Sequence, residues 1–119
     1  MGKNECMDSP NPDAFCPVYH RAVELIGRRW TGAILRALLN GVNRFSDLTA
    51  TVPGMSDRML SERLKELEAE GVVVRRVIPD TPVRIEYELT DKGRALQGVI
   101  LALSEWASRW TVQEAAEAT

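Results

Sequence analysis

Cysteine, histidine and arginine side chains carry most of the chemistry that this chain offers. Cys16 lies directly before Pro17, and His20, the one histidine of the chain, follows within one helical turn. One histidine and two cysteines rule out most zinc-ligand sets and most Ser-His arrangements. The sequence also lacks any other constellation of nucleophile, base or metal, so we expect no enzyme, no metal and no cofactor.

Basic residues are distributed unevenly along the chain, although its formal net charge is −2. Between positions 21 and 44 there are five arginines and one acid, Glu24. Over 44–84 the count is even, with seven basic and seven acidic residues. DNA binding requires a local basic surface rather than a basic total, so the elements that position these residues decide the interpretation.

Apolar spacing of about 3.6 residues predicts helices over about 17–26, 31–40, 46–52 and 57–70. Ser46 is expected to cap the third helix with Phe45 packed just before it, and Ser56 to cap the fourth. A tight turn that contains Pro53-Gly54 joins these two helices, which predicts a helix-turn-helix. The first helix is expected to carry Val18, Ala22, Leu25 and Ile26 on one apolar face. The residues expected to face inward from the later helices are Ile34, Leu35, Leu38, Leu39, Leu60, Leu64 and Leu67.

After Gly71 the apolar period changes to two, which predicts a β-hairpin within 72–89 whose tip is 79–82. A last helix is expected over about 91–110. The predicted fold is therefore mainly α-helical with a small antiparallel hairpin, a winged helix-turn-helix. Its domain is expected over 16–111, between a flexible arm over 1–15 and a frayed tail over 112–119. The residues expected on the buried face of the hairpin are Val83, Ile85, Tyr87 and Leu89.

The fourth helix is the predicted recognition helix, because the N-terminal residues of such a helix contact base edges in the major groove. Arg58 is the best candidate for a base contact, since arginine can donate to O6 and N7 of guanine together. Neighbouring serine, arginine and lysine side chains suit phosphate or sugar contacts, and hairpin arginines could reach phosphates or a minor groove. The alternative is a solvated helix face held by ion pairs between neighbouring turns. The complete set of candidate DNA contacts is Arg44, Ser56, Arg58, Met59, Ser61, Glu62, Arg63, Lys65, Arg75, Arg76 and Arg84.

The last helix keeps an apolar stripe along nearly its whole length, and a chain this small has little core with which to cover it. A second subunit is the economical partner, so we expect a homodimer that forms through the N- and C-terminal helices. The alternative is that the first helix and the arm cover the stripe within one chain. Trp30, Trp106 and Trp110 could also line an effector pocket between subunits, although tryptophan at helical spacing is more often core. The candidate interface residues are Val99, Ile100, Leu103, Trp106 and Trp110.

Several segments match a known pattern in order and spacing: Cys16-Pro17, Ile26-Gly27-Arg28-Arg29-Trp30, Arg44-Phe45-Ser46-Asp47-Leu48, Met59-Leu60-Ser61-Glu62-Arg63-Leu64-Lys65-Glu66-Leu67-Glu68, Val83-Arg84-Ile85-Glu86-Tyr87-Glu88-Leu89-Thr90 and Gly93. Over about residues 16–110 the chain resembles the HxlR-type winged-helix regulators, relatives of the MarR group. Within that family it is most similar to the YodB-like repressors that sense quinones, aldehydes or diamide. The resemblance implies a transcriptional repressor that binds double-stranded DNA.

The resemblance also implies a redox role for Cys16, because those repressors carry a reactive cysteine directly before a proline near the first helix. An oxidant or electrophile would modify its thiolate or form an intersubunit disulfide. The changed spacing of the recognition helices would then release the operator or, in activator members, allow it to be bound productively. This chain departs from the pattern in a longer arm with a second cysteine, Cys6, which is a weaker redox candidate. It has no cysteine after Trp110, so a disulfide would use Cys6, Cys16 or their symmetry mates.

A position near a helix N-terminus favours the thiolate of Cys16 and lowers its pKa. The alternative is an inert, half-buried thiol at the dimer interface. Two other functions are compatible with the same fold. One is a MarR-like regulator that responds to a bound small molecule, and the other is a protein-interaction module that binds DNA only non-specifically. A dimer should cover two half-sites about one helical turn apart, so we expect a palindromic operator. The N-terminus lacks an apolar signal core, which predicts a cytoplasmic protein without a membrane partner.

Overall fold

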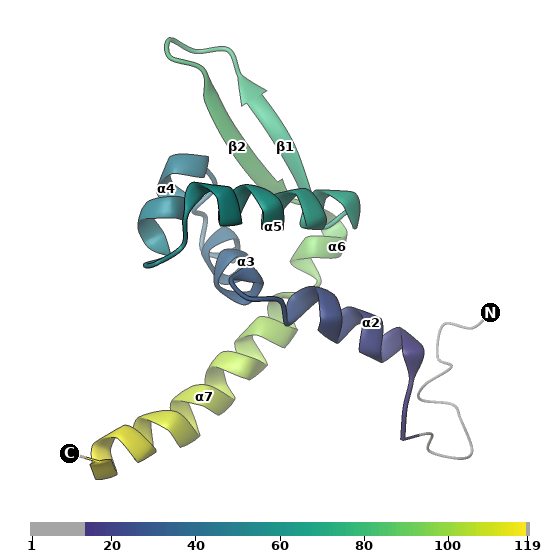
Figure 1. Ribbon diagram of the computed structural model, residues 1–119, viewed down its shortest axis with the longest axis vertical. Coiled ribbons are helices and arrows are strands. Elements are labelled where there is room, and N and C mark those ends of the chain that lie inside the picture. The colour runs from purple at the N-terminus through teal and green to yellow at the C-terminus, as the bar shows by residue number, and fades with distance from the viewer. Residues whose placement is uncertain (1–13, 119) are drawn as a thin grey trace.

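The chain folds as a winged helix-turn-helix body from which two helices extend in different directions (Figure 1). The computed structural model describes residues 14–118, with side chains through residue 111. The predicted fold class is confirmed, because the described part of the chain is mainly helical and its strands form an antiparallel pair. The elements, in chain order, are α2 (Pro17–Ile26), α3 (Thr31–Leu39), α4 (Phe45–Thr51), α5 (Asp57–Ala69), β1 (Val73–Ile78), β2 (Arg84–Leu89), α6 (Asp91–Arg94) and α7 (Gln97–Ala118).

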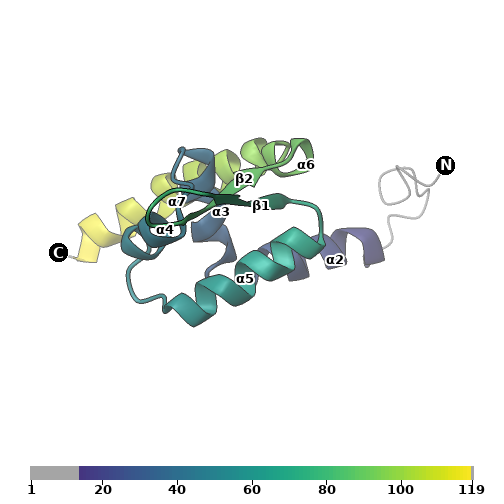
Figure 2. The same ribbon diagram turned by 90° about the horizontal axis from the view of Figure 1, so that it is seen from above.

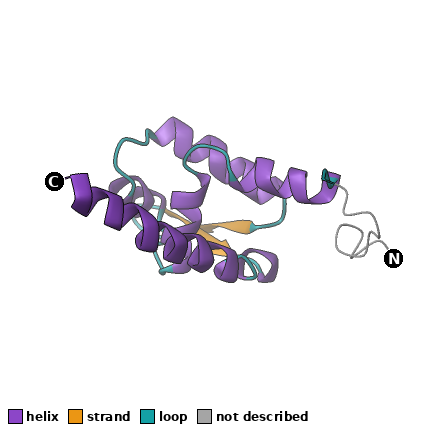
Figure 3. Ribbon diagram, turned by 90° about the horizontal axis from the view of Figure 1, so that it is seen from below, coloured by secondary structure: helices purple, strands orange, loops and turns teal. Residues whose placement is uncertain are grey.

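The core lies where α3, α4 and α5 meet the two strands, which run between layers of helices in Figure 3. Each large aliphatic side chain contributes about 1.5–3 kcal/mol when it is removed from water. The helix-turn-helix is therefore held by its apolar faces, which leaves the opposite face of α5 in solvent. The fully buried aliphatic side chains at the predicted helix positions are Ile34, Leu35, Leu60, Leu64 and Leu67, and Leu48 of α4 joins them.

Helix α2 has the predicted bounds but contributes little to the core. Its last residues, Leu25 and Ile26, pack partly against the core, and none of its residues is buried. Val18 and Ala22, the other two residues of the predicted apolar face, are exposed. The reason is that α2 runs outward from the body and meets it mainly at its C-terminal end (Figures 1 and 2).

Helix α4 begins one residue earlier than predicted. Arg44 is extended, with φ −82° and ψ 140°, and its carbonyl accepts the N–H of Leu48 at 2.9 Å. Arg44 is therefore the N-cap, and the predicted cap, Ser46, lies inside the first turn. The helix ends at Thr51, because Val52 is extended before a proline and the residue before proline avoids the helical conformation.

The turn between α4 and α5 is fixed by two side chains. Ser56 caps α5 as predicted, since its Oγ accepts the N–H of Met59 at 3.1 Å. The hydroxyl of Thr49 donates to Asp57 Oδ1 at 3.0 Å, which ties α4 to the first turn of α5. Helix α5 ends before Gly71, whose φ of +76° suits glycine.

The second strand of the hairpin shows the predicted alternation of apolar and polar faces. Tyr87 and Leu89 are buried and Ile85 is partly buried, whereas Val83 precedes β2 and is exposed. The loop before α4 adds to the sheet, because the N–H of Tyr87 donates to the carbonyl of Asn43 at 2.8 Å. The base of the hairpin is therefore anchored to the body, and its tip projects from it (Figure 1).

The predicted last helix is broken into α6 and α7. Thr90 caps the start of α6, since its hydroxyl accepts the N–H of Gly93 at 3.1 Å. At the break the N–H of Leu96 donates to the carbonyl of Gly93, three residues back, at 3.0 Å. Helix α7 continues to Ala118, beyond the predicted end near 110, and the segment expected to fray is helical. Its last seven residues are mostly alanine and glutamate, which are strong helix formers. Neither α7 nor any other helix within residues 14–118 is apolar and long enough to span a membrane.

Gly93→Ala is expected to lower the free energy of unfolding by about 1–3 kcal/mol, the usual cost of overpacking. A Cβ at this position would overlap the backbone carbonyl oxygen of Val72 and crowd Leu89. Urea unfolding followed by circular dichroism measures the change. Gly32→Ala is the matched control, because its Cβ would meet nothing within 4 Å in helix α3. Equal stabilities of the two variants would contradict this packing argument.

Candidate nucleic-acid interface

The exposed face of α5 carries polar side chains that point away from the leucine core. Arg58 is one of them, with 87% of its side chain accessible. Its Nε donates to Glu62 Oε2 at 3.3 Å, one helical turn later. An exposed pair of this kind contributes only about 0–1 kcal/mol, so Arg58 can leave Glu62 for a stronger acceptor such as a guanine edge.

Arg63 does not lie on that exposed face, which corrects its prediction as a phosphate contact. Only 7% of its side chain is exposed. Its Nε donates to the carbonyl of Arg29 at 2.9 Å, and one of its terminal nitrogens pairs with Glu66 at 3.0 Å. These partners within the chain satisfy the guanidinium and explain its burial.

Two other predicted contacts on α5 have structural roles as well. Met59 is partly buried and packs against the core. Ser56 is exposed and caps the helix through its oxygen lone pair, so its hydroxyl proton can still donate to a phosphate. Ser61 is half-buried beside the hairpin.

A hollow of about 530 Å³ separates α5 from the hairpin and carries one cation on each side. Lys65 projects from α5 and Arg75 from β1, and both residues are exposed. Among the described residues neither makes an ion pair. Two adjacent cations without partners favour an anionic group between the helix and the hairpin. The hollow is lined by Phe45, Ser61, Lys65, Glu68, Arg75, Ile85 and Tyr87.

The two remaining hairpin arginines are paired within the hairpin. Arg76 bonds to Glu88 at 2.9 Å across the strands. Arg84 is half-buried and lies 3.4 Å from Asp80 and 3.5 Å from Glu86. Their charges are therefore already balanced, which distinguishes them from Arg75.

Arg44 completes the set of candidate cations. It is exposed at the start of α4, and its backbone forms an antiparallel bridge with Glu86 of β2. This bridge places Arg44 next to the hairpin.

Cys16 is the N-cap residue of α2, as predicted from its position before Pro17. Its sulfur accepts the N–H of Tyr19 at 3.4 Å, and Pro17 is the first helical residue. The residue is half-buried and disulfide-bonded in this structure. Cys6, the weaker redox candidate, lies outside the described residues.

The apolar stripe of α7 is divided between two faces. Ile100 is 5% exposed and packs into the chain's own core beside α3, so its assignment to a dimer interface is wrong. Sequence spacing did not identify Tyr19 and Val23 of α2 as further exposed apolar residues, although they adjoin the predicted stripe of that helix. The exposed stripe on α7 consists of Val99, Leu103, Trp106 and Trp110.

Comparison with known proteins identifies the family. The model of the HxlR-like helix-turn-helix family matches residues 25–115. The chain is 54% identical over 100 residues to the HTH-type transcriptional regulator YvaP of Bacillus subtilis (strain 168), which covers 84% of this chain and 93% of YvaP.

Solved structures of redox regulators are similar in fold. The reduced form of the transcriptional regulator YodB from B. subtilis has 46% identity and a TM-score of 0.71, over 81% of this chain and 94% of that chain. YodB has also been solved in diamide-treated and quinone-bound forms. The redox regulator HypR in its oxidized form has 36% identity and a TM-score of 0.73, over 79% of this chain and 96% of that chain. This chain therefore belongs to the HxlR-like helix-turn-helix family and is a transcriptional regulator of the helix-turn-helix type.

Proposed function

We propose that this chain binds double-stranded DNA sequence-specifically as a homodimer, with α5 in the major groove and the hairpin along the backbone. The observation that carries this proposal is the arrangement of cations on and beside the exposed face of α5. Arg58 begins that face, and Lys65 and Arg75 border the hollow between α5 and the hairpin. Arginine on the N-terminal turns reads base edges, and the flanking cations suit phosphates.

The proposed partner of the exposed α7 stripe is a second copy of the chain. Four large apolar side chains on one face of a helix are an unusual surface for a monomer. A two-fold dimer presents two copies of α5, so its half-sites would be about 34–36 Å apart, one turn of DNA.

Selection from a random-sequence DNA pool tests this proposal. The reduced and the oxidised protein are each used to enrich duplexes at fixed salt, and the enriched sequences are read. We expect a palindrome with half-sites one helical turn apart. Recovery of no enriched sequence, with binding no tighter than about 10⁻⁴–10⁻⁶ M, would leave only a non-specific interaction module.

Arg75→Gln is expected to weaken binding to every duplex about equally and to reduce the slope of log Kd against log salt by about 1. The reason is that the variant loses a phosphate contact, and no acid of the hairpin pairs with Arg75 in place of the phosphate. The slope is measured by fluorescence anisotropy over a series of salt concentrations. Arg76→Gln removes the same charge from a pair with Glu88, and little change of slope is expected. A larger change for Arg76→Gln would contradict the assignment.

We further propose that oxidation or electrophilic modification of Cys16 controls this binding and that the regulator is a repressor. The supporting observation is the N-cap position of the sulfur, where the free N–H groups of the first turn stabilise negative charge on a thiolate. Diamide converts two thiols into one disulfide by accepting two protons and two electrons. The similarity to YodB and HypR supports the same chemistry here.

A further inference from the structure

The turn between α2 and α3 has an unusual backbone that the proposed function leaves unexplained. Trp30, the N-cap of α3, has a φ of +81°, a left-handed conformation that non-glycine residues rarely adopt. Its ring packs partly against the core, and the guanidinium of Arg29 lies 4.7 Å from the ring centroid. The turn is therefore held in one conformation by the side chains at its end.

This turn contacts the recognition helix through polar groups. The buried Arg63 of α5 donates to the carbonyl of Arg29, as described above. Arg28 pairs with Glu66 of α5 at 3.1 Å. The same oxygen of Glu66 also accepts from Arg63, so one carboxylate joins guanidinium groups from the turn and from α5.

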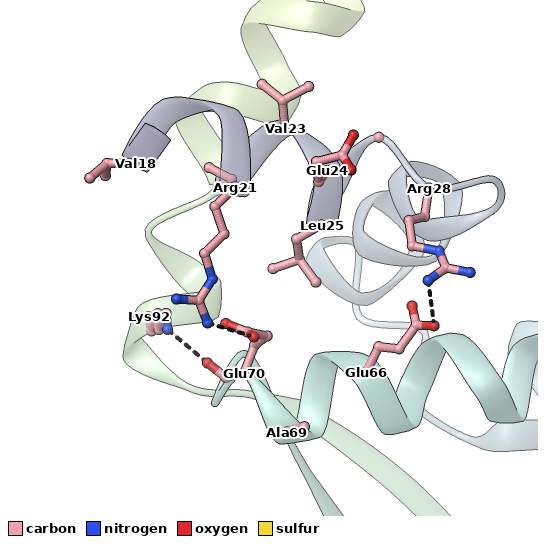
Figure 4. Close-up of a pocket in the computed structure, with 12 residues that line it drawn as sticks. Val18, Arg21, Val23, Glu24, Leu25, Arg28, Glu66, Ala69, Glu70 and Lys92 are labelled. Atoms are coloured by element: carbon pink, nitrogen blue, oxygen red, sulfur yellow. Dashed lines mark hydrogen bonds and ion pairs between the residues drawn. The ribbon is translucent and has the colours of Figure 1, made fainter. Parts of the chain in front are cut away.

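A second link lies one helical turn further along, at Glu70, the C-cap of α5. Arg21 of α2 pairs with Glu70 at 3.3 Å, and Lys92 donates to the backbone carbonyl of Glu70 at 2.7 Å (Figure 4). A groove of about 1040 Å³ runs between α2 and α5, and no residue of α2 is buried. Apolar packing therefore fixes α2 to α5 only weakly, and the ion pairs set the distance between them.

We propose that these residues, Arg21, Arg28, Arg63, Glu66 and Glu70, form a clamp that sets the orientation of α5 relative to α2. We assign them as positioning residues for DNA binding, because their charged groups pair with one another, and Arg63 also lies 4.0 Å from Glu62, the partner of Arg58. The proposal rests on the DNA-binding function proposed above. In a homodimer that uses α2 and α7, the clamp would fix the geometry of each recognition helix relative to the dimer axis.

The decisive variant is Glu66→Gln, measured against the duplex that the wild-type protein enriches from the random pool. Removal of an acid from α5 should tighten DNA binding if only net charge matters. The clamp predicts the opposite, a weakening of about fivefold or more, since contacting residues are coupled by factors of this order. Glu68→Gln makes the same charge change on an exposed part of α5 outside the clamp, at the hollow that Lys65 and Arg75 border, and it should tighten binding. Tighter binding by both variants would overturn the proposal.

Non-additivity provides a second test. Arg28→Gln should weaken binding, and the double variant with Glu66→Gln should bind no more weakly than the weaker single variant. If the fold-changes in Kd of the two single variants multiply in the double variant, the clamp proposal is wrong. Because Glu66 also pairs with the buried Arg63, its replacement can unfold the chain, so thermal unfolding is measured alongside. The exposed pair of Arg21 and Glu70 gives an independent cycle of Arg21→Gln, Glu70→Gln and the double variant.

Hydrogen exchange of the DNA-free protein separates failure of the clamp from failure of the proposed function. Amides of residues 28–31 and of α5 should exchange faster in Arg28→Gln than in the wild-type protein and in Glu68→Gln. Unchanged exchange would overturn the clamp even if the protein binds DNA. If the wild-type protein enriches no duplex, the DNA-binding proposal fails, and the exchange rates still decide whether the clamp exists.

Discussion

Leu103→Glu is expected to make the chain monomeric and to weaken its binding to the enriched duplex by about a thousandfold or more, the usual margin between specific and non-specific binding. Leu103 lies in the exposed stripe of α7, and 55% of the residue is accessible in the isolated chain. A glutamate there costs the folded protomer little. In a two-fold interface it would place two buried carboxylates close together.

Sedimentation velocity measures the oligomeric state, and anisotropy with the enriched duplex measures the affinity. Ser108→Glu is the control, because Ser108 is exposed on another face of the same helix and adds the same charge. It should leave both the dimer and the affinity unchanged. A Leu103→Glu protein that stays dimeric and binds normally would show that the α7 stripe has another partner.

Arg58→Ala is expected to weaken binding to the enriched duplex by about 1–3 kcal/mol and to relax specificity at one base pair of each half-site. Arg58 lies in the first turn of α5 with 87% of its side chain accessible, and its present partner, Glu62, holds it weakly. The measurement is affinity for the enriched duplex and for duplexes with each half-site position changed in turn.

Two variants provide controls for this result. Arg109→Ala removes the same side chain from an exposed site on α7 and should leave specificity unchanged. Lys65→Gln should weaken all duplexes equally, as expected for a phosphate contact. If Arg58→Ala also weakens all duplexes equally, Arg58 contacts phosphate and another residue reads the bases.

Apolar spacing predicts the core of this fold well. The buried face of α3 and of α5 is marked by the spacing of apolar residues within each helix. Leu60, Leu64 and Leu67 recur at helical spacing and are all fully buried. The start of α4 depends instead on a contact distant in sequence. The bridge between Arg44 and Glu86 holds Arg44 extended, which moves the cap away from Ser46 despite the preference of serine for that position.

Charged side chains are the part of the site that the sequence predicts least well. Arg63 lies beside the leucine stripe, and its burial depends on a backbone carbonyl contributed by another element, Arg29. Likewise, alternation along the hairpin identifies which residues share a face but not that Arg76 pairs with Glu88. The apolar stripe predicted for the dimer interface on α7 includes one residue too many. Spacing alone does not show that Ile100 packs into the chain's own core.

We propose above that the redox state of the Cys16 sulfur sets the affinity of the protein for DNA. The most direct test is the Kd of the wild-type and Cys16→Ser proteins for the enriched duplex, each measured fully reduced and after diamide treatment, at one salt concentration. If Cys16 is the redox switch, diamide changes the Kd of the wild-type protein and leaves the Kd of Cys16→Ser unchanged. Equal Kd values for the reduced and treated wild-type protein would contradict redox control and direct attention to a bound small-molecule effector.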